Sequence, residues 1–187
     1  MLLRTFVAVS FMLSSHMVLA DSLDLNLSDH SVQFVYGRSF RSAEVTVGAL
    51  YVEKGNNPES HRAAHLGLIA SAERRGTAWR SEAGLGGRLY FASAGSSDAA
   101  ALALGGEFRW FPGEGPVSIG GYGYYAPDIV TGIDAKHLWE AGARVELEVV
   151  RNTAKVYVGY RKMEMRLEND VDVTVDKGGH FGLSIVF

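Results

Sequence analysis

The chain has no cysteine, little proline and little net charge, and each shortage excludes a class of protein. The absence of cysteine excludes disulfide frameworks, thiol chemistry and a lipid anchor on an N-terminal cysteine. Only four of the 187 residues are proline, so extended strands can run without interruption. The formal net charge of -3 gives no support for general nucleic-acid binding, which requires a basic patch.

Long apolar runs are also scarce. Arg4 precedes an apolar run over residues 6–19, and small residues at 18–20 resemble a cleavage site. This run is short for a membrane-spanning helix, which needs about 20 apolar residues, but it has the layout of a secretory signal peptide. We therefore expect residues 1–20 to be a cleaved leader and residues 21–187 to form one domain.

The remaining chain is dominated by a two-residue hydrophobic period. Between residues 79 and 91, odd positions carry mostly apolar side chains, and even positions carry charged or very small ones. Residues 100–110 and 138–149 show the same alternation. A period of two predicts β-strands, and the 22 glycines suit a curved sheet.

Two features favour a membrane barrel over a soluble β-sandwich. Several alternating segments exceed nine residues, the length that a tilted strand needs to span a bilayer. Aromatic rings also gather near the segment ends, as in the two girdles of a barrel. One rim is expected to hold Tyr51, Phe91, Tyr125 and Trp139, and the other Tyr36, Trp79, Trp110, Phe111 and Phe187.

Segment boundaries and joins predict an even number of strands. The expected strands are 22–28, 31–38, 43–53, 64–73, 78–92, 99–111, 117–126, 137–150, 154–166 and 171–187. Joins after even-numbered strands are short, whereas three of the others are longer, at 54–63, 93–98 and 127–136. That alternation is typical of outer-membrane barrels, with tight periplasmic turns and larger external loops. The fold class is therefore an all-β, single closed antiparallel transmembrane β-barrel of ten strands, with eight as the alternative.

The C-terminal segment resembles the assembly signal of bacterial outer-membrane barrels. Phe181, Leu183, Ile185 and Phe187 share one face of the expected last strand. A barrel needs this strand to pair with its first strand and close the sheet. The valines at 171, 173 and 175 share the same parity, with acidic residues opposite, which predicts an acidic ribbon above the membrane.

Several short segments together resemble the YfaZ family of bacterial outer-membrane proteins. They are 22–28 (SLDLNLS), 85–90 (LGGRLY), 102–107 (LALGGE), 124–127 (YYAP) and 156–161 (VYVGYR). The resemblance covers essentially all of the chain after the leader. It implies a signal peptide and an outer-membrane barrel, and it implies no catalytic activity or catalytic residues.

The charged face of the expected strands is the main functional lead. An Arg or Lys facing lipid near mid-membrane costs roughly 2–4 kcal/mol, so these side chains are expected to point into the lumen. The predicted lumen charge network is Arg80, Glu82, Arg88, Glu107, Arg109, Glu140, Arg144, Glu146, Glu148 and Arg161. Such a network either fills a narrow barrel or lines a small pore.

Other candidate sites favour ordinary structural roles. The acidic group Glu168, Asp170, Asp172 and Asp176 is expected to be a solvated face rather than a cation site. His61 and His65 lack the glutamate of a metalloprotease helix, and the adjacent Asp29 and His30 are typical of a turn. We expect no catalytic residue, cofactor or metal.

The sequence thus predicts a protein of the cell outer membrane with a structural or surface-interaction role and a charge-filled lumen. The alternatives are a narrow porin-like channel for small solutes and a soluble periplasmic ligand-binding barrel. Expected partners are outer-membrane lipid, lipopolysaccharide and, during insertion, the barrel-assembly machinery. No nucleic acid is expected.

Overall fold

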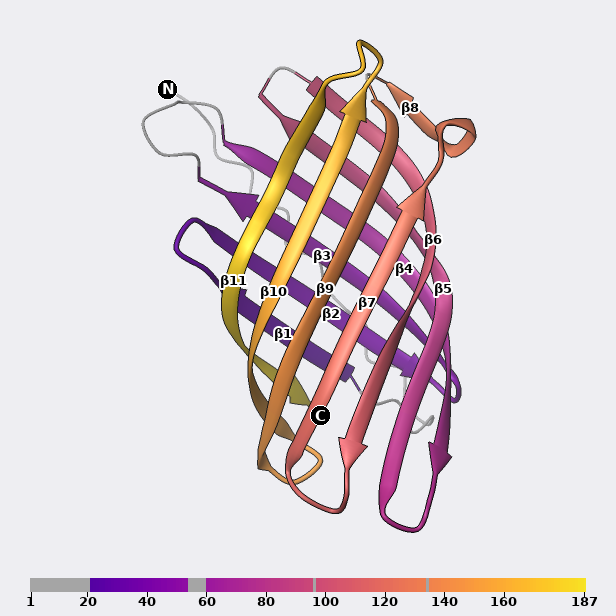
Figure 1. Ribbon diagram of the computed structural model, residues 1–187, viewed down its shortest axis with the longest axis vertical. Coiled ribbons are helices and arrows are strands. Elements are labelled where there is room, and N and C mark those ends of the chain that lie inside the picture. The colour runs from indigo at the N-terminus through magenta and orange to yellow at the C-terminus, as the bar shows by residue number, and fades with distance from the viewer. Residues whose placement is uncertain (1–20, 54–59, 96, 134) are drawn as a thin grey trace, which may run out of the picture.

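The described part of the chain forms one closed β-barrel (Figure 1). The computed structural model describes residues 21–53, 60–95, 97–133 and 135–187. Within these residues, eleven strands form a single sheet, and ten of them close into the barrel. In the same part of the chain, no helix is long and apolar enough to cross a bilayer. The expected leader lies outside the described residues.

The strands follow the alternating segments of the sequence closely. They are β1 (Asp21–Leu27), β2 (Ser31–Phe40), β3 (Ala43–Val52), β4 (His61–Arg75), β5 (Trp79–Ala94), β6 (Ser97–Pro112), β7 (Val117–Ala126), β8 (Thr131–Ile133), β9 (Ala135–Val150), β10 (Ala154–Leu167) and β11 (Asp172–Val186). A 3-10 turn, η1 (Asp128–Val130), precedes β8.

Closure of the sheet confirms the ten-stranded antiparallel barrel. Strand β1 pairs with β11, placing Leu25 opposite Leu183, and β5 pairs with β6. The alternative of eight strands is wrong, because β1 and β2 are separate strands that pair with each other. The short β8 pairs only with β6, at residues 99–101, and is not one of the ten strands that close the barrel.

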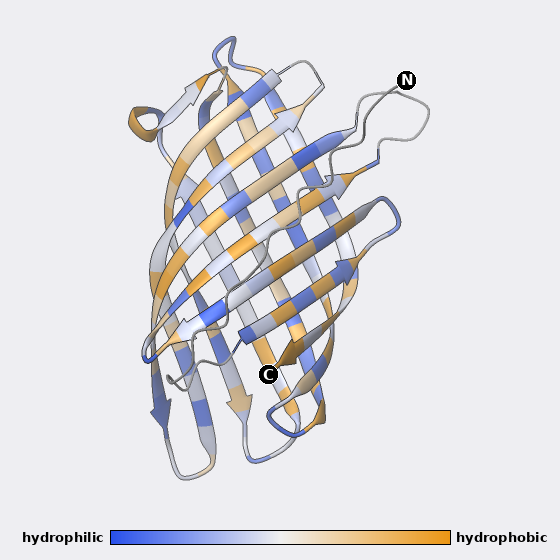
Figure 2. Cartoon of the chain, turned by 180° about the vertical axis from the view of Figure 1, so that it is seen from behind, coloured by the Kyte–Doolittle hydropathy of each residue, from blue (hydrophilic) through white to orange (hydrophobic). Residues whose placement is uncertain are grey.

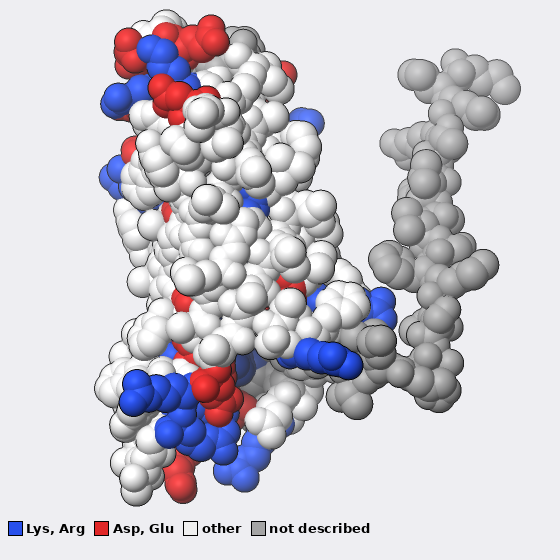
Figure 3. Space-filling model, turned by 90° about the vertical axis from the view of Figure 1, so that its right-hand side faces the viewer, with Lys and Arg blue, Asp and Glu red and all other residues white. Residues whose placement is uncertain are grey.

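The two faces of the wall have opposite chemistry. Leu85, Val145 and Leu183 lie on the outside and are 77%, 47% and 39% exposed. Glu140 and Glu146 lie inside and are each 2% exposed. Hydrophobic and hydrophilic residues alternate along the strands in Figure 2. In Figure 3, Lys, Arg, Asp and Glu gather at two ends of the molecule, and the band between them is mostly uncharged. A soluble barrel needs the reverse arrangement, with leucines inside and arginines outside.

The expected aromatic girdles are largely present, with one correction. Tyr51, Phe91 and Tyr125 near one end and Trp79 near the other are all exposed on the outside. The prediction for Phe111 is wrong, because its ring is buried and lies 3.8 Å beneath the Arg80 guanidinium. An inward ring can stack on a guanidinium, and its parity places it on the lumen side.

A β-bulge changes the expected phase of the last strand. The β10–β11 register shifts between Met163 and Glu164, so Asp176 and Thr174 are paired but Val175 is not. One extra residue reverses the faces beyond it. Val175 is therefore buried in the lumen, whereas the sequence pattern placed it on the outside.

Glycines make room for the rings inside the barrel. A Cβ atom at Gly142 would lie 2.6 Å from a ring carbon of Tyr122, and one at Gly159 would lie 2.8 Å from Nε2 of His180. Real Cβ atoms do not approach so closely, so these large side chains lie over glycines of neighbouring strands. Large side chains that lie over glycines therefore fill the small interior of this narrow barrel.

Candidate functional site in the lumen

An apolar plug fills the outer half of the lumen, at the end opposite the short turns. Met163, Met165 and Leu138 are almost fully buried there. They pack in one cluster with a wall of alanines from β5 and β6. The alanines of that wall are Ala92, Ala94, Ala99, Ala101 and Ala103. Long side chains against short ones leave little free volume, so the plug closes this end of the lumen.

The first polar cluster lies beneath the plug and centres on Glu140. Tyr90 donates a hydrogen bond of 2.5 Å to one carboxylate oxygen, and Tyr122 donates one of 2.9 Å to the other. Arg88 lies 3.5 Å from the same carboxylate and 4.0 Å from the ring of Tyr124. A buried charge requires such partners, and here one cation and two hydroxyl groups supply them.

The second cluster centres on Glu146. Its carboxylate accepts hydrogen bonds from Arg109 at 3.2 Å and Ser118 at 3.1 Å, and Arg144 forms an ion pair with it at 2.6 Å. Lys155 lies 3.6 Å away.

Together with Glu146, two further carboxylates balance the three cations of this second cluster. Arg109 also pairs with Glu82 at 2.9 Å, and Arg144 pairs with Asp24 at 3.2 Å. The cluster thus joins strands from both walls of the barrel, with the charges matched.

The third cluster is a brace built on Arg161, which is 1% exposed. Its guanidinium donates two hydrogen bonds to Asp176, of 2.8 and 2.6 Å, and one of 3.2 Å to Asn26. It also donates to Gln33, which accepts a 2.7 Å bond from Asn26. The brace connects β10, β11, β1 and β2, which are four consecutive strands of the wall and include the closing β1–β11 pair.

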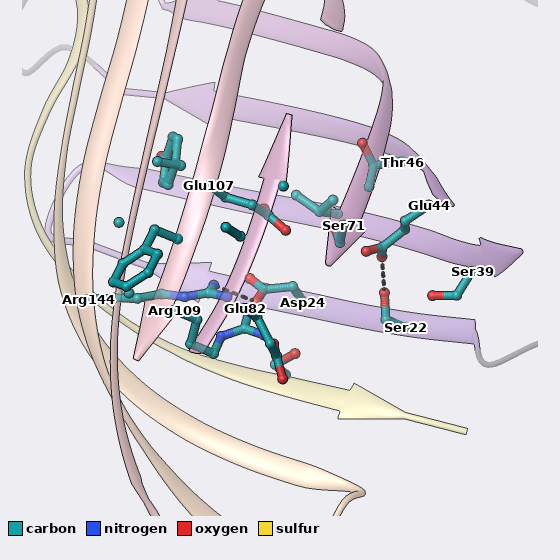
Figure 4. Close-up of a pocket in the computed structure, with 18 of the residues that line it drawn as sticks. Ser22, Asp24, Ser39, Glu44, Thr46, Ser71, Glu82, Glu107, Arg109 and Arg144 are labelled. Atoms are coloured by element: carbon teal, nitrogen blue, oxygen red, sulfur yellow. Dashed lines mark hydrogen bonds and ion pairs between the residues drawn. The ribbon is translucent and has the colours of Figure 1, made fainter. Parts of the chain in front are cut away.

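A polar cavity of about 440 Å³ opens toward the short turns, and residues of all three clusters, among them Arg88, Arg144 and Arg161, line it. Arg41 and Ser42 of the β2–β3 turn stand at its mouth. Figure 4 shows Glu44 and Glu107 at this cavity, with Glu44 accepting a 3.1 Å hydrogen bond from Ser22. Among the described residues, neither carboxylate forms an ion pair.

The ten residues of the predicted lumen charge network occupy different positions. Arg88, Arg109, Glu140, Arg144, Glu146 and Arg161 lie in the three clusters, with Glu82 at their edge. Glu107 lines the same cavity but belongs to none of the clusters. Arg80 lies near the short turns, 3.7 Å from Glu82. Glu148 lies apart from the clusters, where it caps the β9–β10 turn by accepting a bond from the Asn152 backbone.

Sequence reasoning missed several partners of these charges. Asp24 and Asn26 alternate with the leucines of β1, and Lys155 and Tyr157 share parity with Arg161, so strand parity was a usable signal. Tyr157 donates a 2.5 Å hydrogen bond to Asp24. Parity identifies the inward face, but it does not say which strands meet across the lumen.

The acidic group of the last hairpin is divided between two environments. Asp176 is buried with Arg161, because it has the same parity as His180 and Ser184, which line the lumen. Asp170 pairs with Lys136 and Asp172 with Arg166, both at the exposed end of the hairpin. In the part of the chain that is described, no group of three His, Asp or Glu side chains is arranged to hold a metal ion.

The two histidines lie on β4. The expected strand 64–73 already contained His65, and β4 begins three residues earlier and so includes His61. His61 and His65 both point into the lumen and are buried. One nitrogen of His61 lies 3.1 Å from the carbonyl oxygen of Val175. The His65 ring lies 5.7 Å from that of Tyr90. Both rings therefore take part in filling the barrel.

A closed barrel with an apolar exterior and an ion-paired interior defines an outer-membrane β-barrel protein. The chain belongs to the YfaZ family, whose model, described as YfaZ precursor, matches residues 3–187. None of the curated proteins compared with the chain matches it. Among solved structures, Neisserial surface protein A (NspA) is similar at 11% identity, with 90% of this chain and 94% of that chain covered and a TM-score of 0.39.

Proposed function

We propose that this protein is a non-conducting outer-membrane barrel with a structural or surface-interaction role. The observation that supports this is the apolar plug across the outer half of the lumen, with Leu138 and Met165 fully buried. Below it, the three clusters tie the walls together with matched charges. The proposal assigns no catalytic step to the protein.

Single-channel recording in planar lipid bilayers tests the closed lumen. The unmodified barrel is expected to give no discrete current steps. A variant with Leu138→Ala, Met163→Ala and Met165→Ala is expected to give them, because three long side chains leave the plug. Each such change costs about 2–5 kcal/mol, so folding of the variant is checked by gel mobility with and without boiling. Reproducible steps from the unmodified protein would overturn the proposal.

The last strand is proposed to engage the barrel-assembly machinery during insertion. Phe181 and Leu183 project outward on β11, which closes the barrel against β1, and Phe187 follows the strand directly and is also exposed. Phe187→Ala is expected to lower the fraction of heat-modifiable barrel in the outer membrane without lowering the stability of barrel that has folded. Equal yields of variant and unmodified protein would refute this role.

A further inference from the structure

A groove of about 590 Å³ crosses the outside of the barrel over β2 to β6, with β8 at its edge. Ala49 and Ala64 are opposite each other in the β3–β4 ladder and form the floor. Phe34 and Phe91 are the next residues along the same row, on β2 and β5, and form the two sides. Strands lie about 4.8 Å apart, so the two rings flank a strip roughly 14 Å wide.

The row on the outer side of this floor is polar. Tyr51 and Arg62 are opposite each other in the β3–β4 ladder, one residue from the outer ends of their strands. The guanidinium carbon of Arg62 lies 6.0 Å from the centre of the Tyr51 ring. The exposed Arg62 forms no ion pair with any residue that the structure describes. Asp98 lies two strands away on the far side of the groove.

The apolar floor and the single cation, Arg62, lie at different depths in the membrane. An arginine facing lipid costs several kcal/mol at mid-membrane and almost nothing at the interface, so Arg62 belongs at headgroup level. Tyr51 has the amphipathic ring typical of the same level. The floor then lies one row deeper, beside the acyl chains of the outer leaflet. The strands that carry the groove cross the face seen in Figure 2.

We propose that the Ala49–Ala64 groove binds lipopolysaccharide, with acyl chains over the two alanines and a phosphate group on Arg62. Three observations support this occupant rather than a protein. The floor has no side-chain polar group, its width admits more than one hydrocarbon chain, and Arg62 offers an unpaired positive charge at the level of the lipid phosphates. The proposal rests on the outer-membrane location and does not depend on a closed lumen.

Native mass spectrometry of the full-length barrel in detergent micelles tests the site, with purified lipid A as the probe. Ala64→Phe fills the floor with a ring, and Arg62→Gln removes the charge. Each is expected to lower the affinity for lipid A about tenfold, since a charge-assisted hydrogen bond or an acyl-chain contact is lost. Phosphatidylglycerol, which has one phosphate and two chains, is expected to bind more weakly than lipid A.

Two matched variants separate the groove from general lipid contact. Ala143→Phe adds the same ring to an exposed alanine of β9, and Arg74→Gln removes an exposed charge at the opposite end of β4. Both are expected to bind lipid A as the unmodified barrel does. Unchanged affinity in Ala64→Phe and Arg62→Gln, equal losses in the two control variants, or equal binding of phosphatidylglycerol would each overturn the proposal. None of these outcomes depends on bilayer conductance, so failure of this proposal is distinguishable from failure of the closed-lumen proposal.

Discussion

At the scale of single residues, Arg161 carries the greatest structural demand. Its guanidinium is almost wholly buried and satisfied by Asp176, Asn26 and Gln33. Removing one member of a buried pair leaves the other charge without compensation, which costs about 3–5 kcal/mol. Exposed ion pairs contribute about 0–1 kcal/mol, so most other pairs at the rims matter far less.

Arg161→Met is therefore expected to lower the free energy of unfolding by about 3–5 kcal/mol, because it leaves Asp176 charged and unpaired in the lumen. Urea unfolding in lipid vesicles, followed by tryptophan fluorescence, measures the loss. The double variant Arg161→Met and Asp176→Leu is expected to recover part of it. Arg75→Ala, which breaks an exposed pair with Glu73, is the control. A loss no larger than in that control would contradict the brace.

The exposed end of the last hairpin predicts a pH effect of known sign. Lys136 donates a hydrogen bond to Asp170, and this contact lowers the pKa of that carboxyl below its ordinary value. A lowered folded-state pKa stabilises the fold above the unfolded pKa, and this contribution disappears as the pH falls through the folded pKa. Lys136→Gln is expected to raise the pKa of Asp170 in an NMR titration. The pKa of Asp172, which Arg166 lowers, should move much less. Equal shifts at both sites would contradict the pairing.

At the scale of strands, the sequence predicted those features that depend on local residues and missed those that depend on a partner strand. Alternation along the chain predicts strand and face at once, and all ten barrel strands were found within a few residues of their expected ranges. The bulge at Val175 was missed because it depends on the β10 partner and not on the β11 sequence alone. The β8 strand was missed because three residues are too few to show a period.

The packing of glycines between strands gives a prediction at this scale. A Cβ at Gly86 would lie 2.7 Å from the Cα of Ile69 and closer still to the carbonyl oxygen of Leu68. Because these are backbone atoms, the β4–β5 ladder would have to part, and Gly86→Ala is expected to destabilise the barrel by about 1–3 kcal/mol. Gly115→Ala, with no atom within 4 Å of its Cβ, is expected to be neutral or slightly stabilising in the same urea unfolding assay. Equal stability of the two variants would contradict the tight contact.

At the scale of the whole molecule, the sequence predicted the class of protein and the charges that point inward. It did not predict how those charges are divided into clusters at different heights in the barrel. Parity places Arg88 and Glu140 inside, yet it does not reveal that Tyr90 and Tyr122 share the same carboxylate. Those contacts depend on the stagger between distant strands, which sets the height of each residue in the barrel. The same stagger places the methionines of β10 against the alanines of β6 and so creates the plug.

A non-conducting barrel of this build requires a lumen that water enters from the short-turn end alone. Because the chain has no cysteine, single cysteines report on this directly. Ser71→Cys lines the cavity and Ala101→Cys lies within the plug. In proteoliposomes, a membrane-impermeant thiol reagent is predicted to label Ser71→Cys only when it is supplied on the side of the short turns. It is predicted to leave Ala101→Cys unlabelled from either side. Labelling of Ser71→Cys from the loop side in a folded barrel would contradict the closed lumen.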